Sequence, residues 1–234
     1  MTVTKNNCGV NHLLNGLSKS QYQWFIDHSE SVELSFGQAL SRAHRPLKSV
    51  YFPITCCISS LSKANHQCVE VSLMGNEGML GAELALGVVY ATSNSIVSIA
   101  GHALRIDSES FLRWVNNSSD VSASVNRYLY QLMLQLAQTS FCNRFHDVQQ
   151  RLARWLLMVS DRTSNEPLYL THQFLATILG VRRSAVTIAA RVLHQKELIS
   201  YTRGQLCVLS RDGLKKVTCQ CYFASSKAEH KLTQ

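Results

Sequence analysis

The chain has 234 residues, of which 46% are hydrophobic and 16% charged. That length fits one large domain or two small ones, and the apolar content is enough for a buried core, which excludes wholesale disorder. No run approaches the ~18 uninterrupted apolar residues of a transmembrane helix, and the first residues lack the pattern of a signal peptide. We therefore expect a cytoplasmic protein without a membrane partner.

The net charge of +8 is unevenly distributed. Residues 1–150 hold ten Lys/Arg and ten Asp/Glu, whereas residues 151–216 hold eleven Lys/Arg and four Asp/Glu. A neutral front and a basic back indicate two modules, the second facing a polyanion. A basic surface that serves only solubility is the alternative, and composition alone does not separate the two.

The eight cysteines are expected to be free and mostly buried thiols, because a reducing cytoplasm disfavours disulfides. No C-x-x-C pair is present, and Cys219-x-Cys221 is tighter than the usual zinc spacing. These spacings argue against a metal site.

Along the chain, residues 11–28 predict one or two short helices. From Val32 to about Ile106, short apolar runs then alternate with Gly, Ser, Asn and Pro, a pattern typical of a β-sandwich or barrel. The predicted strands are Val32–Phe36, Leu47–Pro53, Thr55–Leu61, Val69–Leu73 and Ile96–Leu104.

A long helix is predicted from about Ser119, because apolar residues recur there at steps of 3 or 4. So narrow a stripe favours packing against a twin helix in a homodimer, and the alternative is that it covers the chain's own β-domain. The candidate interface residues are Val121, Val125, Leu129, Leu132 and Leu136. A further helix is predicted over His146–Asp161, with its arginines Arg151, Arg154 and Arg162 in solvent.

The strongest signal is LTHQFLATILGVRRSAVTIAARVL, at Leu170–Leu193. A small residue (Ala176), a glycine four positions later (Gly180) and a branched residue ten positions on (Val186) suit two helices that cross at a tight corner. No acidic residue occurs between Pro167 and Lys196, as a helix in the major groove of DNA requires. A basic solvated helix on an ordinary bundle is the alternative.

The candidate DNA-binding residues share a place on the two helices or on the β-hairpin wing predicted after them: Thr171, Gln173, Arg182, Arg183, Ser184, Thr187, Arg191 and Arg203. Arg183 is expected to read a guanine, because it lies in the first turn of the second helix. Thr171 and Gln173 are expected at phosphates, and Arg203 at the tip of the wing.

With these motifs the chain resembles the Crp/Fnr superfamily of transcription regulators over nearly its full length. The resemblance rests on the C-terminal segment through Cys219-Gln-Cys221-Tyr222, and on Gly75-Asn-Glu-Gly78-Met-Leu-Gly81 and Ala100-Gly-His-Ala-Leu-Arg105 in the β-region. It implies an α+β chain: an N-terminal cyclic-nucleotide-binding-like β-roll (a double-stranded β-helix, or jelly roll) over residues 1–118, a dimerisation helix over 119–145, a winged helix-turn-helix over 146–222 and a tail over 223–234. It further implies operator or promoter DNA, a second copy of the chain and RNA polymerase as partners.

The sequence departs from relatives that bind cofactors, so none is predicted. Cyclic AMP binding is disfavoured because no Arg or Lys lies between Gly81 and Arg105 to pair with its phosphate. An iron–sulfur cluster is disfavoured because Cys8 is alone near the N-terminus. A haem bound by one of the nine histidines stays open.

Two alternative functions make different demands on the sequence. A jelly-roll metal-dependent oxygenase needs clustered histidines and a carboxylate, whereas His44, His66 and His102 are isolated. A winged helix that binds protein does not need a face without acidic residues. We expect a DNA-binding protein and not an enzyme.

Overall fold

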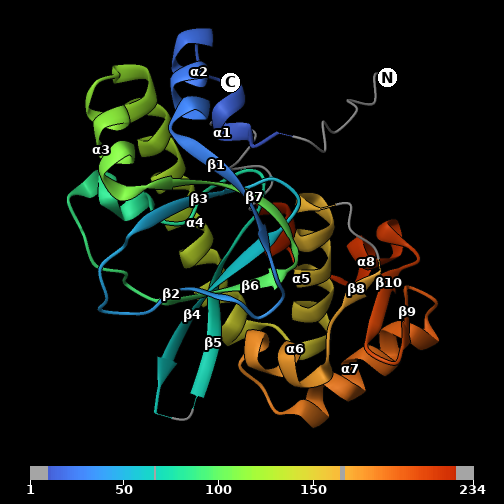
Figure 1. Cartoon of the computed structure of the whole chain (residues 1–234). Helices are drawn as coiled ribbons and strands as arrows, with labels where there is room; N and C mark the ends of the chain where they lie inside the picture. The colour runs from blue at the N-terminus through green and yellow to red at the C-terminus, as the bar shows by residue number, and fades with distance from the viewer. Residues whose placement is uncertain (1–9, 66, 164–166, 225–234) are drawn as a thin grey trace.

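A computed structural model describes residues 10–65, 67–163 and 167–224 (Figure 1). Cys8, His66 and most of the predicted tail lie outside these residues. The observed α+β fold, a β-roll followed by a long helix and a helix-turn-helix, confirms the predicted fold class.

The N-terminal half is a roll of two antiparallel sheets, with strand orders β1-β7-β3 and β2-β6-β4-β5. The strands are β1 (Ser29–Leu34), β2 (Ala39–Ser41), β3 (Ser49–Pro53), β4 (Cys57–Ala64), β5 (Gln67–Met74), β6 (Asn94–Ile99) and β7 (Gly101–Asp107). Alternating burial, as at Val50 and Phe52 of β3, follows from the two-residue period of a strand. The predicted strand over Ile96–Leu104 is in fact two strands, β6 and β7.

Helices close one end of the roll: α1 (His12–Asn15), α2 (Lys19–Asp27), the 3-10 helix η1 (Ala82–Leu86) and α3 (Ser108–Asn116). Aromatic side chains from helices and strands fill the space between them. Phe25 of α2 packs edge-on against Phe52, with ring centroids 4.8 Å apart, and Trp114 of α3 lies at the same distance from Phe25.

The long helix α4 (Ser119–Phe145) begins at Ser118, whose hydroxyl accepts a hydrogen bond from the Val121 amide. Val121 and Val125 are 1% and 4% exposed and belong to the core of the roll, so their assignment to an interface between two chains is wrong. The apolar stripe at the start of α4 covers the chain's own β-domain. Leu129 packs partly against the same core.

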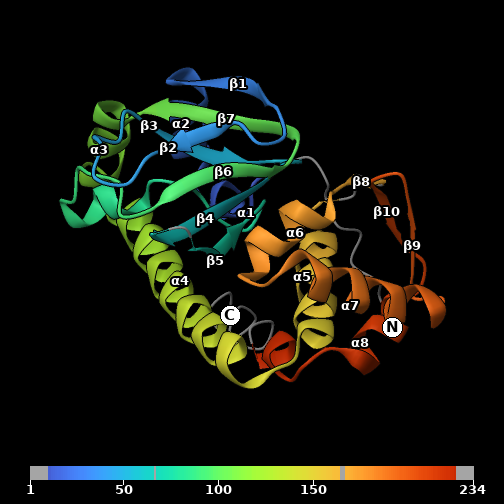
Figure 2. The same ribbon diagram turned by 90° about the horizontal axis from the view of Figure 1, so that it is seen from below.

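The C-terminal half contains α5 (Val148–Arg162), β8 (Leu168–Tyr169), α6 (His172–Leu179), α7 (Arg183–Gln195), β9 (Ile199–Thr202), β10 (Gln205–Val208) and α8 (Arg211–Val217). The expectation that Arg151, Arg154 and Arg162 of α5 are solvated is wrong, since they are only 9%, 6% and 5% exposed. They are buried because α5 packs against α6, α7 and α8 on one side and faces the roll on the other (Figure 2).

The two halves share one hydrophobic core, in which Leu61 and Leu73 of the roll join side chains of α5 and α6. Gly180, at the end of α6, approaches β5 so closely that a Cβ there would lie 3.0 Å from the Val69 side chain. Phe174 of α6 packs against Phe36, with ring centroids 4.9 Å apart. The helix-turn-helix is thus docked on the roll. Of the helices described, none is both long and apolar enough to span a membrane.

Candidate nucleic-acid interface

Local interactions form the tight turn between α6 and α7. The Thr171 hydroxyl caps α6 by accepting a hydrogen bond from the Phe174 amide at 3.0 Å. Gly180 ends α6 in the left-handed conformation (φ +62°), which glycine adopts without strain. Ala176 and Val186 are 3% and 0% exposed where the helices cross, as the spacing predicted.

The outer face of α7 presents donors to solvent. Arg183, Ser184 and Arg191 are exposed, as is Arg182 immediately before the helix. Ile188 lies on the same face and is 63% exposed, although its position in the sequence did not mark it as a contact residue. An apolar side chain among donors is what a thymine methyl group contacts in the major groove. The face therefore offers both hydrogen-bonding and apolar contacts to base edges.

Thr187, another predicted DNA-contact residue, uses its hydroxyl for hydrogen bonds inside the domain. Its hydroxyl donates to the Arg183 carbonyl at 3.1 Å and pairs with Nδ1 of His172 at 2.9 Å. The His172 ring stacks on Tyr201 of β9, with centroids 4.5 Å apart, and burial together with the nearby Arg183 lowers the pKa of His172. A neutral His172 thus joins α6, α7 and the wing, and only the fold reveals this role.

The wing is a hairpin of β9 and β10 joined by Arg203 and Gly204. Both residues have positive φ, +50° and +84°, the conformation of a two-residue type I′ turn. The exposed Arg203 therefore lies at the tip, as expected. Strand β8, which was not predicted, adds a third strand beside β10. Gln173 at the start of α6 is exposed.

Comparison with known proteins agrees with this architecture. Residues 150–217 match the family model of the Crp-like helix-turn-helix domain. Solved structures of Crp/Fnr regulators match most of the chain, roll included. Residues 150–217 therefore form a Crp-like helix-turn-helix domain, and the chain as a whole has the fold of Crp/Fnr regulators.

Three of the similar structures show how far the shared Crp/Fnr fold extends. FixK2 from Bradyrhizobium japonicum is 13% identical with a TM-score of 0.69, over 82% of this chain and 98% of that one. A Crp/Fnr-family regulator from Eubacterium rectale is 14% identical with a TM-score of 0.67, over 88% and 97%. The c-di-GMP responsive global regulator CLP of Xanthomonas campestris is 15% identical with a TM-score of 0.63, over 82% and 100%. At such identities the likeness shows the fold alone. A search of curated protein sequences found no match.

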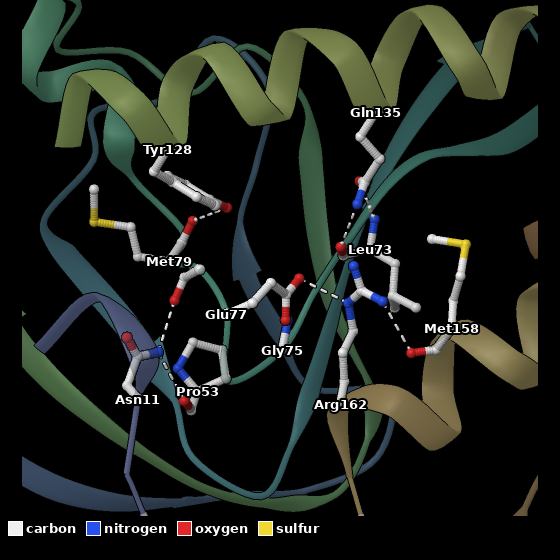
Figure 3. A network of polar contacts seen from close by, with 11 residues as sticks. Asn11, Pro53, Leu73, Gly75, Glu77, Met79, Tyr128, Gln135, Met158 and Arg162 are labelled. Atoms are coloured by element: carbon white, nitrogen blue, oxygen red, sulfur yellow. Dashed lines mark hydrogen bonds and ion pairs between the residues drawn. The ribbon is translucent and has the colours of Figure 1, made fainter. Parts of the chain in front are cut away.

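A polar network joins the roll, α4 and α5 (Figure 3). Glu77 accepts a hydrogen bond from the Gly75 amide at 3.1 Å and an ion-pair bond from Arg162 Nε at 2.7 Å. A Cβ on Gly75 would lie 2.5 Å from the Arg162 side chain, so only glycine fits there. The Gly75–Gly78 turn, which the sequence indicated only through a family likeness, therefore packs against an arginine of α5 and binds it.

The same region fixes α4 to the roll. Gln135 bonds both backbone groups of Leu73, accepting from its amide at 3.0 Å and donating to its carbonyl at 3.1 Å. The Tyr128 hydroxyl donates to the Met79 carbonyl at 2.9 Å (Figure 3). These hydrogen bonds connect the roll both to the long helix α4 and to α5 of the DNA-binding domain, through residues that are close together in the sequence of the roll.

A cavity of about 360 Å³ lies between the roll and α4. Leu132 and Leu136, predicted as interface residues, line it. Lys63 and His44 also line it, and neither belongs to the segment between Gly81 and Arg105, which has no Arg or Lys. Burial raises the pKa of Glu83, another lining residue.

Proposed function

We propose that this protein is a homodimeric regulator that binds specific DNA sequences through α7, with the wing at the flanking backbone. The single observation that carries this function is the exposed, acid-free face of α7, on which Arg183, Ser184 and Arg191 surround Ile188. Arginine reads guanine by two hydrogen bonds and Ser or Thr adds shorter contacts, while we assign Thr171, Gln173 and Arg203 to phosphates.

The homodimer is supported by the face of α4 that points away from the roll. Large apolar side chains are exposed along it at helical spacing: Tyr130 (51%), Met133 (66%), Phe141 (51%) and Phe145 (63%). They lie on the side of the helix opposite Val121 and Val125, and the steps of 3, 8 and 4 residues between them keep them on one face. An exposed stripe of this length favours a partner helix. We place the dimer seam there and not at the residues first predicted.

The roll is proposed to act as a sensor, and the cavity between the roll and α4 as its binding site. An occupant would contact Leu132 and Leu136, and hence α4 directly. Because the DNA-binding domain rests on the same roll, a shift of α4 would change how α6 and α7 are presented. The protein would act in the cytoplasm with RNA polymerase as a further partner, and not as an enzyme.

The test is selection of binding sites from randomised duplex DNA by the full-length protein at fixed salt. The expected product is an inverted repeat whose half-sites are centred about 34–36 Å apart, one helical turn, because two recognition helices related by a twofold axis read two half-sites. A library that emerges without any enriched sequence would overturn the proposal and would favour the protein-binding alternative.

A further inference from the structure

Four side chains that commonly bind metals meet where α4 ends. Cys142 lies in the last turn of α4 and His146 directly follows the helix, while Cys219 and Cys221 follow α8. Their ligand atoms all lie within 4.8 Å of one another. We call these four residues the cysteine–histidine cluster. The spacing argument against a metal site considered only neighbours in the sequence, whereas the fold joins two pairs that are 77 and 75 residues apart.

The distances within the cluster are those of ligands around a single ion. The sulfur atoms of Cys142 and Cys219 are 3.6 Å apart, and Cys221 Sγ lies 3.4 Å from Nδ1 of His146. Around a tetrahedral zinc ion, bond lengths of ~2.3 Å to sulfur and ~2.0–2.1 Å to nitrogen separate the ligand atoms by ~3.8 and ~3.6 Å. A disulfide needs ~2.05 Å between sulfurs. An iron–sulfur cluster places several irons and sulfides between its cysteines and needs a wider spread than this.

Charge gives an independent indication. Arg154 of α5 is only 6% exposed, and its Nε and Nη2 have no hydrogen-bond partner among the described residues. It interacts electrostatically with Cys142 and Cys221. A buried guanidinium whose donors lack acceptors is costly, and the nearby Glu70 is a weak counter-charge because burial favours its protonated form. Three thiolates and a neutral imidazole around a divalent cation carry a net charge of −1, which would balance Arg154.

We propose that Cys142, His146, Cys219 and Cys221 bind one zinc ion in a closed structural site. Three sulfurs and one nitrogen are a usual structural zinc set, and soft thiolates select zinc over magnesium or calcium. The cysteines are at most 3% exposed and the protein supplies all four ligands, so no position remains for a substrate. The ion would fasten the end of the DNA-binding domain to the end of α4, at the turn where α4 passes into α5 (Figure 2).

The experiment measures metal in the full-length protein purified anaerobically with a reductant. We expect about one zinc per chain that survives gel filtration and is released when a mercurial modifies the thiols. Replacement by cobalt should produce thiolate charge-transfer and tetrahedral d–d absorption bands. A wild-type protein that holds no metal and gains none on zinc titration, or that holds iron instead, or a disulfide between Cys142 and Cys219, would overturn the proposal.

Variants separate the cluster from the other thiols. Cys219→Ser and His146→Ala should weaken zinc affinity by more than about 100-fold, because a lost ligand costs at least as much as a lost supporting residue. His146→Cys should retain zinc, since a set of four cysteines is also common in structural sites. The matched control is Cys207→Ser, which removes a half-buried thiol of the same domain outside the cluster. Equal affinity in all four variants would show that zinc binds elsewhere.

Hydrogen exchange with and without zinc keeps the proposal testable if a variant folds poorly. Removal of zinc from the wild type should speed exchange at residues 142–148 and 218–222 by at least about tenfold and leave β4 and β5 unchanged, because the ion closes only the contact between α4 and the C-terminal segment. Identical exchange in both states would contradict a structural ion at this position.

Discussion

The indole Nε1 of Trp155, on α5, donates to both carboxylate oxygens of Glu70, on β5, at 3.1 and 3.2 Å. Ser59 on the neighbouring strand β4 donates to the same carboxyl group, and Arg154, Arg162 and Cys57 also interact with it electrostatically. Burial raises the pKa of Glu70 to about 7 in spite of these hydrogen bonds and cations. A carboxyl group that titrates near neutral pH therefore lies at the contact between the roll and the DNA-binding domain.

The Glu70 pKa predicts how stability depends on pH. The folded state binds the proton more tightly than the unfolded state, so this group's contribution is complete below about pH 4.5 and is lost as the pH rises through about 7. The pKa difference corresponds to about 3 kcal/mol. Glu70→Gln, which keeps both hydrogen-bonding directions, should remove this dependence and be more stable than wild type at pH 8. Urea unfolding of both proteins from pH 5 to 8 checks it, and parallel profiles would show that Glu70 is already ionised when folded.

The buried ion pair between Glu77 and Arg162 should contribute more to stability than an exposed pair. Glu77→Gln removes one carboxylate partner of an arginine side chain that is 6% exposed, and should lower the free energy of unfolding by about 3 kcal/mol. The control is Glu30→Gln, whose partner Arg105 has a side chain 39% exposed, with an expected cost below about 1 kcal/mol. Denaturation at fixed pH measures both, and equal costs would contradict the importance of this contact.

Arg183 and Arg203 should differ in what they contribute to DNA binding. Arg183→Ala should cost about 1–3 kcal/mol per half-site and relax the preference at one base pair, because it removes a base contact. Arg203→Ala should weaken all sequences alike and flatten the dependence of affinity on salt, because it removes a phosphate contact. Titration of both variants against an operator library shows the difference. If Arg183→Ala lowers affinity equally for every sequence, Arg183 contacts the backbone.

The exposed stripe on α4 predicts where the dimer can be broken. Met133→Glu combined with Phe141→Glu should raise the dimer dissociation constant more than about 100-fold, since burying unpaired charge at a seam costs several kcal/mol. Gln131→Glu adds the same kind of charge to α4 off the stripe and should leave the dimer intact. Analytical ultracentrifugation measures this, and a wild-type protein that sediments as a monomer at micromolar concentration while binding its operator fully would refute the seam.

The helix-turn-helix could be predicted from the sequence because its signals are local. The cap at Thr171, the glycine at Gly180 and the small and branched residues at Ala176 and Val186 all lie within one short segment, and each acts through its own backbone or near neighbours. The absence of acidic residues from the same segment likewise predicted which face of α7 would meet DNA. The order of roll, long helix and winged domain followed from a change in hydrophobic period.

What only the tertiary structure decided involves contacts between distant segments. The periodicity of α4 shows that it has an apolar face, but Val125 covers the roll while Met133 faces outward, and only the packing reveals which face is free. Arg162 looks like a solvated residue until the Gly75 turn is placed against it. Cys142 and Cys219 meet because α4 and α8 end at the same place, 77 residues apart in the chain. Burial and ligand geometry depend on such approaches, and local spacing does not encode them.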